Sequence, residues 1–256
     1  MAQVTLITGA SAGIGYELAR IFAAAKHRVA LVARRAERLQ ALADEIVASG
    51  GEQPIVIACD LRKSDACETI SAALQAARVD VEYLVNNAGF GLYGDAVALD
   101  RAEQLAMTDL NVRALTELCL GFADQLIRNK GGILNVGSVA GFMPGPRMAV
   151  YYASKAYVVS FSEALHSELA PKGVRVTVLC PGPVPTEFQG RAGMAVGTAD
   201  MLSISAAKVA RDGYDGLMAG KRMVLPGIGI KIIPAMLRLV PRGVVLSLVS
   251  RMQGGP

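Results

Sequence analysis

The stretch TLITGASAGIG, residues 5–15, decides the fold. The apolar run Val4–Thr8 predicts a buried strand, and an amphipathic helix is predicted over residues 13–26. Gly9 permits a tight turn out of the strand, and Gly13 lets the backbone approach a pyrophosphate closely. Unpaired N–H groups at the start of the helix then face the anion. The stretch therefore predicts a nucleotide-binding turn, whereas the alternative is a turn that uses glycine only for packing.

Short apolar runs alternate with longer amphipathic segments along the rest of the chain. This alternation predicts an α/β fold with a doubly wound, seven-stranded parallel Rossmann-type sheet flanked by helices, in one domain over residues 1–226. The predicted strands are Val4–Thr8, Val29–Val32, Ile55–Cys59, Tyr83–Asn86, Gly132–Val136, Val174–Cys180 and Arg222–Leu225. The predicted helices cover residues 13–26, 35–49, 63–77, 101–129, 152–171 and 204–219.

The composition argues against several classes of protein. Apolar residues make up 52% of the 256 residues, enough for a large core, yet no stretch of 18 residues lacks a charge. The four cysteines have no CxxC spacing and the two histidines lie far apart, so we expect reduced thiols and no metal site. The start of the chain lacks the pattern of a signal peptide, so we expect a cytoplasmic protein. The basic tail has no aromatic residue, which argues against nucleic-acid binding.

The end of the second predicted strand points to the cofactor. Proteins that prefer NAD carry an acidic residue there, but this chain has Ala33 followed by Arg34 and Arg35. An arginine at this place can pair with the 2′-phosphate of NADP. We therefore expect NADP(H) to be preferred over NAD(H), with Arg34 the stronger candidate. The alternative is that both arginines simply begin a solvated helix.

A possible acid–base pair follows the fifth predicted strand. Tyr151 and Lys155 stand four residues apart on a predicted helix and therefore share one face, about one turn apart. A nearby ammonium lowers the pKa of a phenol, which suits proton transfer to a carbonyl oxygen. Ser138, at the carboxyl end of the strand, can hold the same oxygen. The three residues predict carbonyl–alcohol chemistry.

Taken together, these motifs resemble the short-chain dehydrogenase/reductase family over about residues 3–226. TGASAGIG resembles its TGxxxGxG turn, NNAG at residues 86–89 its segment after the fourth strand, and PGPVPT at 181–186 the segment beside the nicotinamide. Asn111 completes the tetrad with Ser138, Tyr151 and Lys155. The closest resemblance is to NADP-preferring ketone or 3-oxoacyl reductases.

The resemblance implies a role for each residue. Tyr151 would be the acid in reduction, with Lys155 lowering its pKa, Ser138 orienting the carbonyl and Asn111 holding a water that relays protons. The implied cofactor-binding residues are Gly9, Ser11, Gly13, Ile14, Gly15, Arg34, Arg35, Asp60, Leu61, Asn87, Ala88, Gly89, Tyr151, Lys155, Pro181, Gly182, Val184 and Thr186.

The sequence thus predicts an NADPH-dependent reductase of an apolar ketone, aldehyde or 3-oxoacyl compound. One alternative is an NADP-linked alcohol or steroid dehydrogenase that works in the oxidative direction. Another is a regulatory protein that binds NADP without catalysis, against which the complete tetrad argues. By analogy with the family we expect a homodimer or homotetramer.

Two regions do not follow the alternation. Residues 182–203 are rich in small residues, with Met194 and Met201, and are interpreted as a substrate loop beside a pliable apolar pocket. The extension 227–256 is apolar and basic, and residues 221–256 carry six basic side chains and no acidic one. It could pack on the body, on a partner subunit, or peripherally on the inner membrane surface.

Overall fold

The computed structural model describes residues 1–193, 203–227, 236–237 and 239–254. Expectations that concern residues 194–202, including Met194 and Met201, and residues 228–235 lie outside this described part. None of the helices within it combines the length and the apolar character that a membrane crossing needs.

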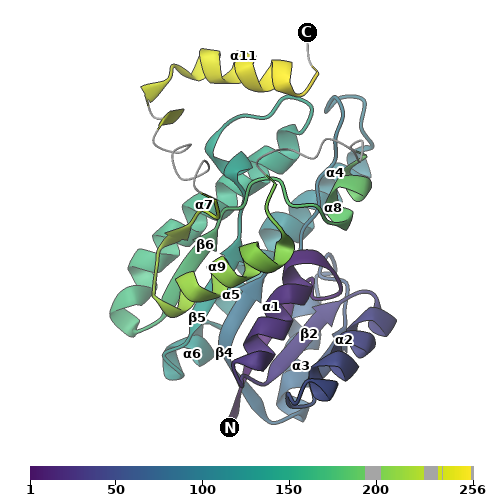
Figure 1. Cartoon of the computed structure of the whole chain (residues 1–256), viewed down its shortest axis with the longest axis vertical. Helices are drawn as coiled ribbons and strands as arrows, with labels where there is room; N and C mark the ends of the chain where they lie inside the picture. Colours follow the sequence, from purple (N-terminus) through teal and green to yellow (C-terminus); the bar gives the residue numbers. More distant parts are fainter. Residues whose placement is uncertain (194–202, 228–235, 238, 255–256) are drawn as a thin grey trace.

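A single parallel sheet forms the centre of the molecule, with helices on both faces (Figure 1). Its strand order, β3-β2-β1-β4-β5-β6-β7, reverses direction next to β1, which confirms the predicted doubly wound, seven-stranded fold. The strands are β1 Ala2–Thr8, β2 Val29–Ala33, β3 Ile55–Ala58, β4 Val79–Asn86, β5 Gly132–Val136, β6 Arg175–Leu179 and β7 Met223–Val224.

The helices divide the buried apolar side chains into two layers. The helices α1 Gly13–Ala24, α2 Ala36–Ala48 and α9 Ala206–Met218 pack on one face of the sheet. The other face is covered by α3 Ala66–Ala76, α5 Leu115–Gly121, α6 Ala123–Arg128 and α7 Ala149–Leu169. Because both faces are covered, the strands are built from near-continuous runs of Val, Ile and Leu.

The predicted helix 101–129 is wrong as one continuous element. The chain forms α4 Arg101–Thr108, a π-helical turn Asp109–Ala114, then α5 and α6 with a break at Phe122. The strand predicted to begin at Tyr83 begins at Val79 instead. Asp80 and Glu82 interrupt the apolar run there, but they alternate with buried valines along the strand.

Two helices occur where no helix was expected. Helix α8, Glu187–Ala192, lies inside the predicted substrate loop, and α11, Arg242–Met252, follows Pro241 near the C-terminus. Val245 and Val249 of α11 are buried, whereas Val244 and Leu248 are exposed. In Figure 1, α11 lies at the end of the molecule beyond α7.

A row of buried amide and hydroxyl groups joins the sheet to α7. Asn86 Nδ2 donates to Asn135 Oδ1 at 2.9 Å, and Asn135 Nδ2 donates to Ser162 Oγ at 2.9 Å. Ser162 Oγ in turn donates to Val158 O at 2.6 Å. Buried polar groups that find partners in this way fix one alignment of their elements, so the row holds α7 in register with β4 and β5.

Candidate active site

A cavity of about 530 Å³ opens at the carboxyl ends of the central strands. This is the place where ligands bind in doubly wound sheets. The structure brings together along its walls all of the residues predicted for the site except Gly15 and Asn111, which lie directly behind the lining.

The glycine-rich turn forms one end of the cavity. Gly9 has a φ of +66°, which favours glycine, and a Cβ there would lie 2.7 Å from Asn87 Nδ2. A Cβ on Gly15 would collide with the same amide and with the carbonyl of Gly9. The turn therefore leaves backbone N–H groups at the start of α1 accessible to an anion, as a dinucleotide cofactor requires.

Thr8 ties this turn to the end of β4. Its buried Oγ1 donates to Val85 O at 3.2 Å and accepts from the N–H groups of Asn87 at 3.0 Å and Ala88 at 3.1 Å. The Asn87 side chain donates in return to the carbonyls of Thr8 and Gly9. Sequence reasoning missed Thr8, although it directly precedes the recognised glycine.

The two arginines after β2 lie at the same end but differ in their partners. Arg35 donates to Ser11 Oγ at 3.1 Å and pairs with Glu187 of α8 at 2.9 Å. Arg34 is exposed, and within the described residues no carboxylate lies within 4 Å of its guanidinium. The arginine that was the stronger candidate for the 2′-phosphate therefore has its donors available for a ligand.

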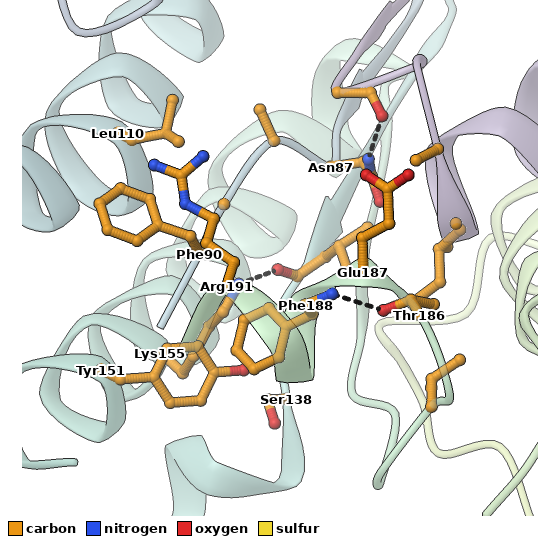
Figure 2. Close-up of a pocket in the computed structure, with 18 of the residues that line it drawn as sticks. Asn87, Phe90, Leu110, Ser138, Tyr151, Lys155, Thr186, Glu187, Phe188 and Arg191 are labelled. Carbon is orange, nitrogen blue, oxygen red and sulfur yellow. Dashed lines mark hydrogen bonds between the residues drawn. The ribbon is translucent and has the colours of Figure 1, made fainter. Parts of the chain in front are cut away.

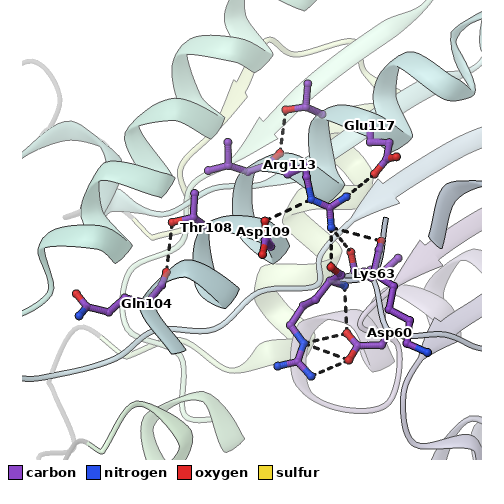
Figure 3. A network of polar contacts seen from close by, with 11 residues as sticks. Asp60, Lys63, Gln104, Thr108, Asp109, Arg113 and Glu117 are labelled. Atoms are coloured by element: carbon purple, nitrogen blue, oxygen red, sulfur yellow. Dashed lines mark hydrogen bonds and ion pairs between the residues drawn. The ribbon is translucent and has the colours of Figure 1, made fainter. Parts of the chain in front are cut away.

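Asp60 lines the cavity and belongs to a network of polar contacts (Figure 3). Arg62 donates hydrogen bonds to both carboxylate oxygens of Asp60, and Arg62 Nη2 lies 2.7 Å from Asp60 Oδ2. This hydrogen bonding holds the pKa of Asp60 at about 2. Arg113 reaches across to the carbonyl of Arg62 at 2.8 Å and pairs with Glu117 at 2.8 Å. Sequence reasoning missed Arg113, whose hydrogen bond joins the segment around Arg62 to the π-helical turn Asp109–Ala114.

The proposed acid–base residues meet at the other end of the cavity (Figure 2). Helix α7 carries Tyr151 and Lys155, and Lys155 Nζ lies 5.8 Å from the centroid of the Tyr151 ring. Ser138 follows the end of β5 after Gly137, lines the same cavity as Tyr151, and its Oγ accepts from Ala140 N at 3.2 Å. The predicted spacing therefore does place the three side chains around one point.

The electrostatics differ from the expectation for the Tyr151 phenol. Burial raises the pKa of Tyr151 to about 12, and the hydrogen bond with Ser138 opposes this rise. Burial also lowers the pKa of Lys155 to about 8. Lys155 Nζ donates to Val136 O at 2.8 Å rather than to the phenol. Burial is the largest cause of the raised pKa, so the Tyr151 phenol carries its proton at neutral pH.

Asn111 lies in the π-helical turn and bonds to the chain beside the cavity. Its Oδ1 accepts from the N–H of Phe90 at 3.1 Å, and its Nδ2 donates to Phe90 O at 2.9 Å and to Ser154 Oγ at 3.1 Å. A Cβ on Gly89 would lie 3.0 Å from Asn111 Oδ1 and 3.6 Å from Lys155 Nζ. The two side chains are therefore neighbours, and the proton relay through water stays a prediction.

Helix α8 adds two residues that sequence reasoning missed. The ring of Phe188 lies 5.3 Å from the ring of Tyr151, between centroids, and Arg191 lies 4.1 Å above the ring of Phe90 (Figure 2). Burial and the nearby Arg34 lower the pKa of Arg191. The signal for α8 is a capping box, in which Thr186 accepts from Phe188 N and Gln189 accepts from Thr186 N.

Comparison with known proteins identifies the family of this chain. Residues 3–195 match the family model described as short chain dehydrogenase. The sulfoacetaldehyde reductase of Chromohalobacter salexigens is 42% identical over 73% of this chain and 75% of its own length.

Solved structures extend the similarity over nearly the whole chain. A short-chain dehydrogenase from Sphingobium yanoikuyae in complex with NADPH is 31% identical, with a TM-score of 0.83 and 95% of each chain covered. The bulky-bulky ketone specific alcohol dehydrogenase from Comamonas testosteroni is 27% identical, with a TM-score of 0.79, covering 95% of this chain and 93% of that one. The chain belongs to the short-chain dehydrogenase family, whose members are oxidoreductases that use NAD(P) to act on carbonyl and hydroxyl groups of small molecules.

Proposed function

We propose that this protein is an NADPH-dependent reductase that converts an apolar ketone, aldehyde or 3-oxoacyl compound into an alcohol. The observation that carries the proposal is one cavity with two different ends. Arg34 and the glycine turn stand at one end, and Tyr151 with Ser138 and Lys155 stands at the other. A dinucleotide that spans these ends presents its reactive ring to the phenol.

NADPH supplies a hydride when it is bound; the chain supplies the proton and the geometry. Tyr151 gives its phenolic proton to the carbonyl oxygen as the carbon–hydrogen bond forms, which leaves a phenolate on the tyrosine. Lys155 stabilises that phenolate by its charge, and a proton from solvent restores the phenol. Ser138 orients the carbonyl oxygen toward the phenol. In the oxidative direction Tyr151 would act as the base with the same partners.

The substrate end of the cavity is lined mainly by apolar side chains, with Arg191 as a charged residue against Phe90. Phe90, Met143, Met148 and Phe188 line the cavity together with Tyr151. Apolar and pliable walls of this kind favour an apolar carbonyl compound over a strongly charged one. The similarity to an alcohol dehydrogenase specific for bulky ketones supports this substrate class, whereas the sulfoacetaldehyde reductase takes its name from a small anionic aldehyde.

The proposal includes an oligomer in the cytoplasm. Leu105, Leu120 and Tyr157 expose apolar surface on α4, α5 and α7, which suits a homodimer or homotetramer. Light scattering after gel filtration measures the mass, and a monomer at micromolar concentration would contradict this part.

The test of the cofactor is a titration of NADPH and NADH against the wild type and Arg34→Ala by calorimetry. Loss of a charge-assisted contact with the 2′-phosphate is expected to weaken NADPH binding about 10- to 100-fold and to leave NADH binding unchanged. The matched control is Arg38→Ala, an exposed arginine one turn later that does not line the cavity. Equal affinity of the wild type for both cofactors would overturn the NADPH assignment.

A further inference from the structure

A second hollow lies beside the active-site cavity, toward the C-terminal helix. It is a groove of about 700 Å³, a volume within the range of small-molecule sites. It runs between the segment after β5, the first turns of α7, and α11. Within the described residues its walls are apolar apart from Tyr152 and the exposed Arg242, and they include Phe142, Pro146, Ala153, Ala156, Val245 and Leu246.

The groove adjoins the active-site cavity. Met143 and Tyr152 line both hollows. The rings of Tyr151 and Tyr152 are 6.1 Å apart between centroids. A chain attached to a carbonyl at Tyr151 therefore needs only to pass Met143 and Tyr152 to enter the groove.

Tyr152 is held in place as the wall between the two hollows. Its ring packs on the backbone of Gly145, where a Cβ would collide with it. At its other end the hydroxyl accepts from Gln253 Nε2 at 2.7 Å. The carbonyl of Gln253 is itself held by the Tyr93 hydroxyl and by Arg147 Nη1 at 3.3 Å. The C-terminal segment thus fixes the Tyr152 side chain, which stands between the catalytic tyrosine and the groove.

We propose that this groove receives the apolar chain of the substrate, so that the enzyme selects carbonyl compounds with a long alkyl or acyl chain. The inference rests on the proposed function, because it places the carbonyl at Tyr151. Burying one methylene gains about 0.8 kcal/mol, or about fourfold in kcat/KM when the contact persists in the transition state. For six added methylenes, of which only part need enter the groove, we expect a gain of about tenfold or more in kcat/KM.

The first experiment measures kcat/KM with NADPH for methyl ketones from 2-butanone to 2-decanone. Val245→Phe fills the groove from α11, and Val244→Phe is the matched control, since the neighbouring Val244 is 57% exposed and does not line the groove. Val245→Phe is expected to remove the gain with chain length, about tenfold for 2-decanone, and to leave 2-butanone within about twofold of the wild type. Val244→Phe is expected to keep the gain.

A second pair of variants covers the case in which Val245→Phe fails to fold. Leu246→Asp places a charge at the groove, and Leu248→Asp places the same charge on the outer face of α11. Only Leu246→Asp is expected to lose the preference for 2-decanone. As a readout without turnover, 2-decanol in the presence of NADPH, a pair with no hydride acceptor, is expected to raise the Tm of the wild type more than that of Leu246→Asp.

The outcomes separate the groove from the proposed function. A wild type that consumes no NADPH with any ketone contradicts the proposed function, and the Tm shift by 2-decanol then decides the groove alone. A kcat/KM that does not change with chain length overturns the assignment of the groove. Variants that lower kcat/KM equally for short and long ketones overturn it as well. A Val245→Phe protein that changes its oligomeric mass and keeps the chain-length gain assigns the groove to a second copy of the chain and overturns the inference as well.

Discussion

The cofactor end and the substrate end of the cavity are built in different ways. At the cofactor end, short side chains such as Thr8 and Asn87 bond to the backbone of neighbouring strands and are largely buried. At the substrate end, Phe188 reaches in from α8, and Gln253 from beyond α11 bonds to Tyr152 without lining the cavity itself. The cofactor end and the residues Tyr151 and Ser138 are held by the sheet and by α7, whereas Phe188 and Gln253 come from segments outside the sheet.

This difference separates shared chemistry from selectivity. The family model matches residues 3–195, which include Thr8, Asn87 and Tyr151 and also Phe188 of α8, whereas α11 and Gln253 lie beyond the match. Changes in the sheet-borne end should therefore affect cofactor binding, catalysis and stability together. Changes in the segments outside the sheet should alter which substrate is preferred and leave the core intact.

The largest expected effect is on the sheet-borne chemistry. Tyr151→Phe removes the proton donor, so we expect turnover to fall about 10³-fold while the affinity for NADPH stays within about threefold. Steady-state rates and a calorimetric titration measure the two quantities. The control is Tyr157→Phe, on the same helix but exposed and bonded to Thr116. Retained turnover in Tyr151→Phe would remove the phenol from the mechanism.

Lys155→Met is expected to raise stability while it abolishes turnover. Burial lowers the pKa of Lys155 from 10.5 to about 8, so below pH 8 the fold carries a buried charge that costs up to about 3 kcal/mol. Between pH 8 and 10.5 the unfolded chain binds the extra proton, and the free energy of unfolding of the wild type should rise with pH relative to the variant. Urea unfolding at pH 7 and pH 10 measures this, and the exposed Lys172→Met is the control. Identical pH dependence in both variants would contradict it.

A smaller effect on stability is expected from the hydrogen bonds of Thr8, which tie the end of β1 to the end of β4. Thr8→Val keeps the shape but leaves the N–H groups of Asn87 and Ala88 without the hydroxyl, which should cost about 2 kcal/mol of unfolding free energy. NADPH affinity should fall with it because both residues line the cavity. Thr8→Ser, which keeps the hydroxyl, serves as the comparison. Equal Tm values for the Val and Ser variants would show that the tie adds nothing.

The smallest expected effect concerns the ion pair between Arg35, after β2, and Glu187 of α8. Glu187→Gln releases Arg35 from an exposed pair, in which the arginine is 39% and the glutamate 56% exposed, so stability should change by less than about 1 kcal/mol. Because Arg35 also contacts Ser11, its release should strengthen NADPH binding about two- to fivefold at low salt. Glu163→Gln, whose pair with Arg222 lies far from the cavity, is the control. Weaker NADPH binding in Glu187→Gln would mean that the glutamate itself supports the cofactor.

The sequence predicted best what depends on short-range spacing. The turn at Gly9 and the pair Tyr151 and Lys155 each lie within one local element, so their geometry follows from the strand, turn or helix alone. The break at Asp109–Ala114 could not be predicted in this way, because Asn111 there bonds to the distant Phe90. A π-helical turn costs helical hydrogen bonds, and such long-range contacts offset the loss.

The contribution of the C-terminal segment beside the substrate end escaped prediction for the same reason. Gln253 bonds to Tyr152 across 101 positions of sequence, and no periodic pattern marks such a pair. The direction in which Lys155 points also depends on tertiary structure, since its partner is the carbonyl of Val136 on the neighbouring strand. Helix α8 is different, because the capping box formed by Thr186 and Gln189 was readable in the sequence.

The buried row from Asn86 through Asn135 to Ser162 has a consequence for how this enzyme can change. Because the row fixes α7 against the sheet from inside the core, it holds Tyr151 in place independently of residues 139–148, which join Ser138 to α7. Met143 and Met148 in that segment line the cavity, so substitutions of these side chains should reshape the substrate end while the row keeps α7 in place. New substrate ranges are open to such a protein without a new catalytic centre.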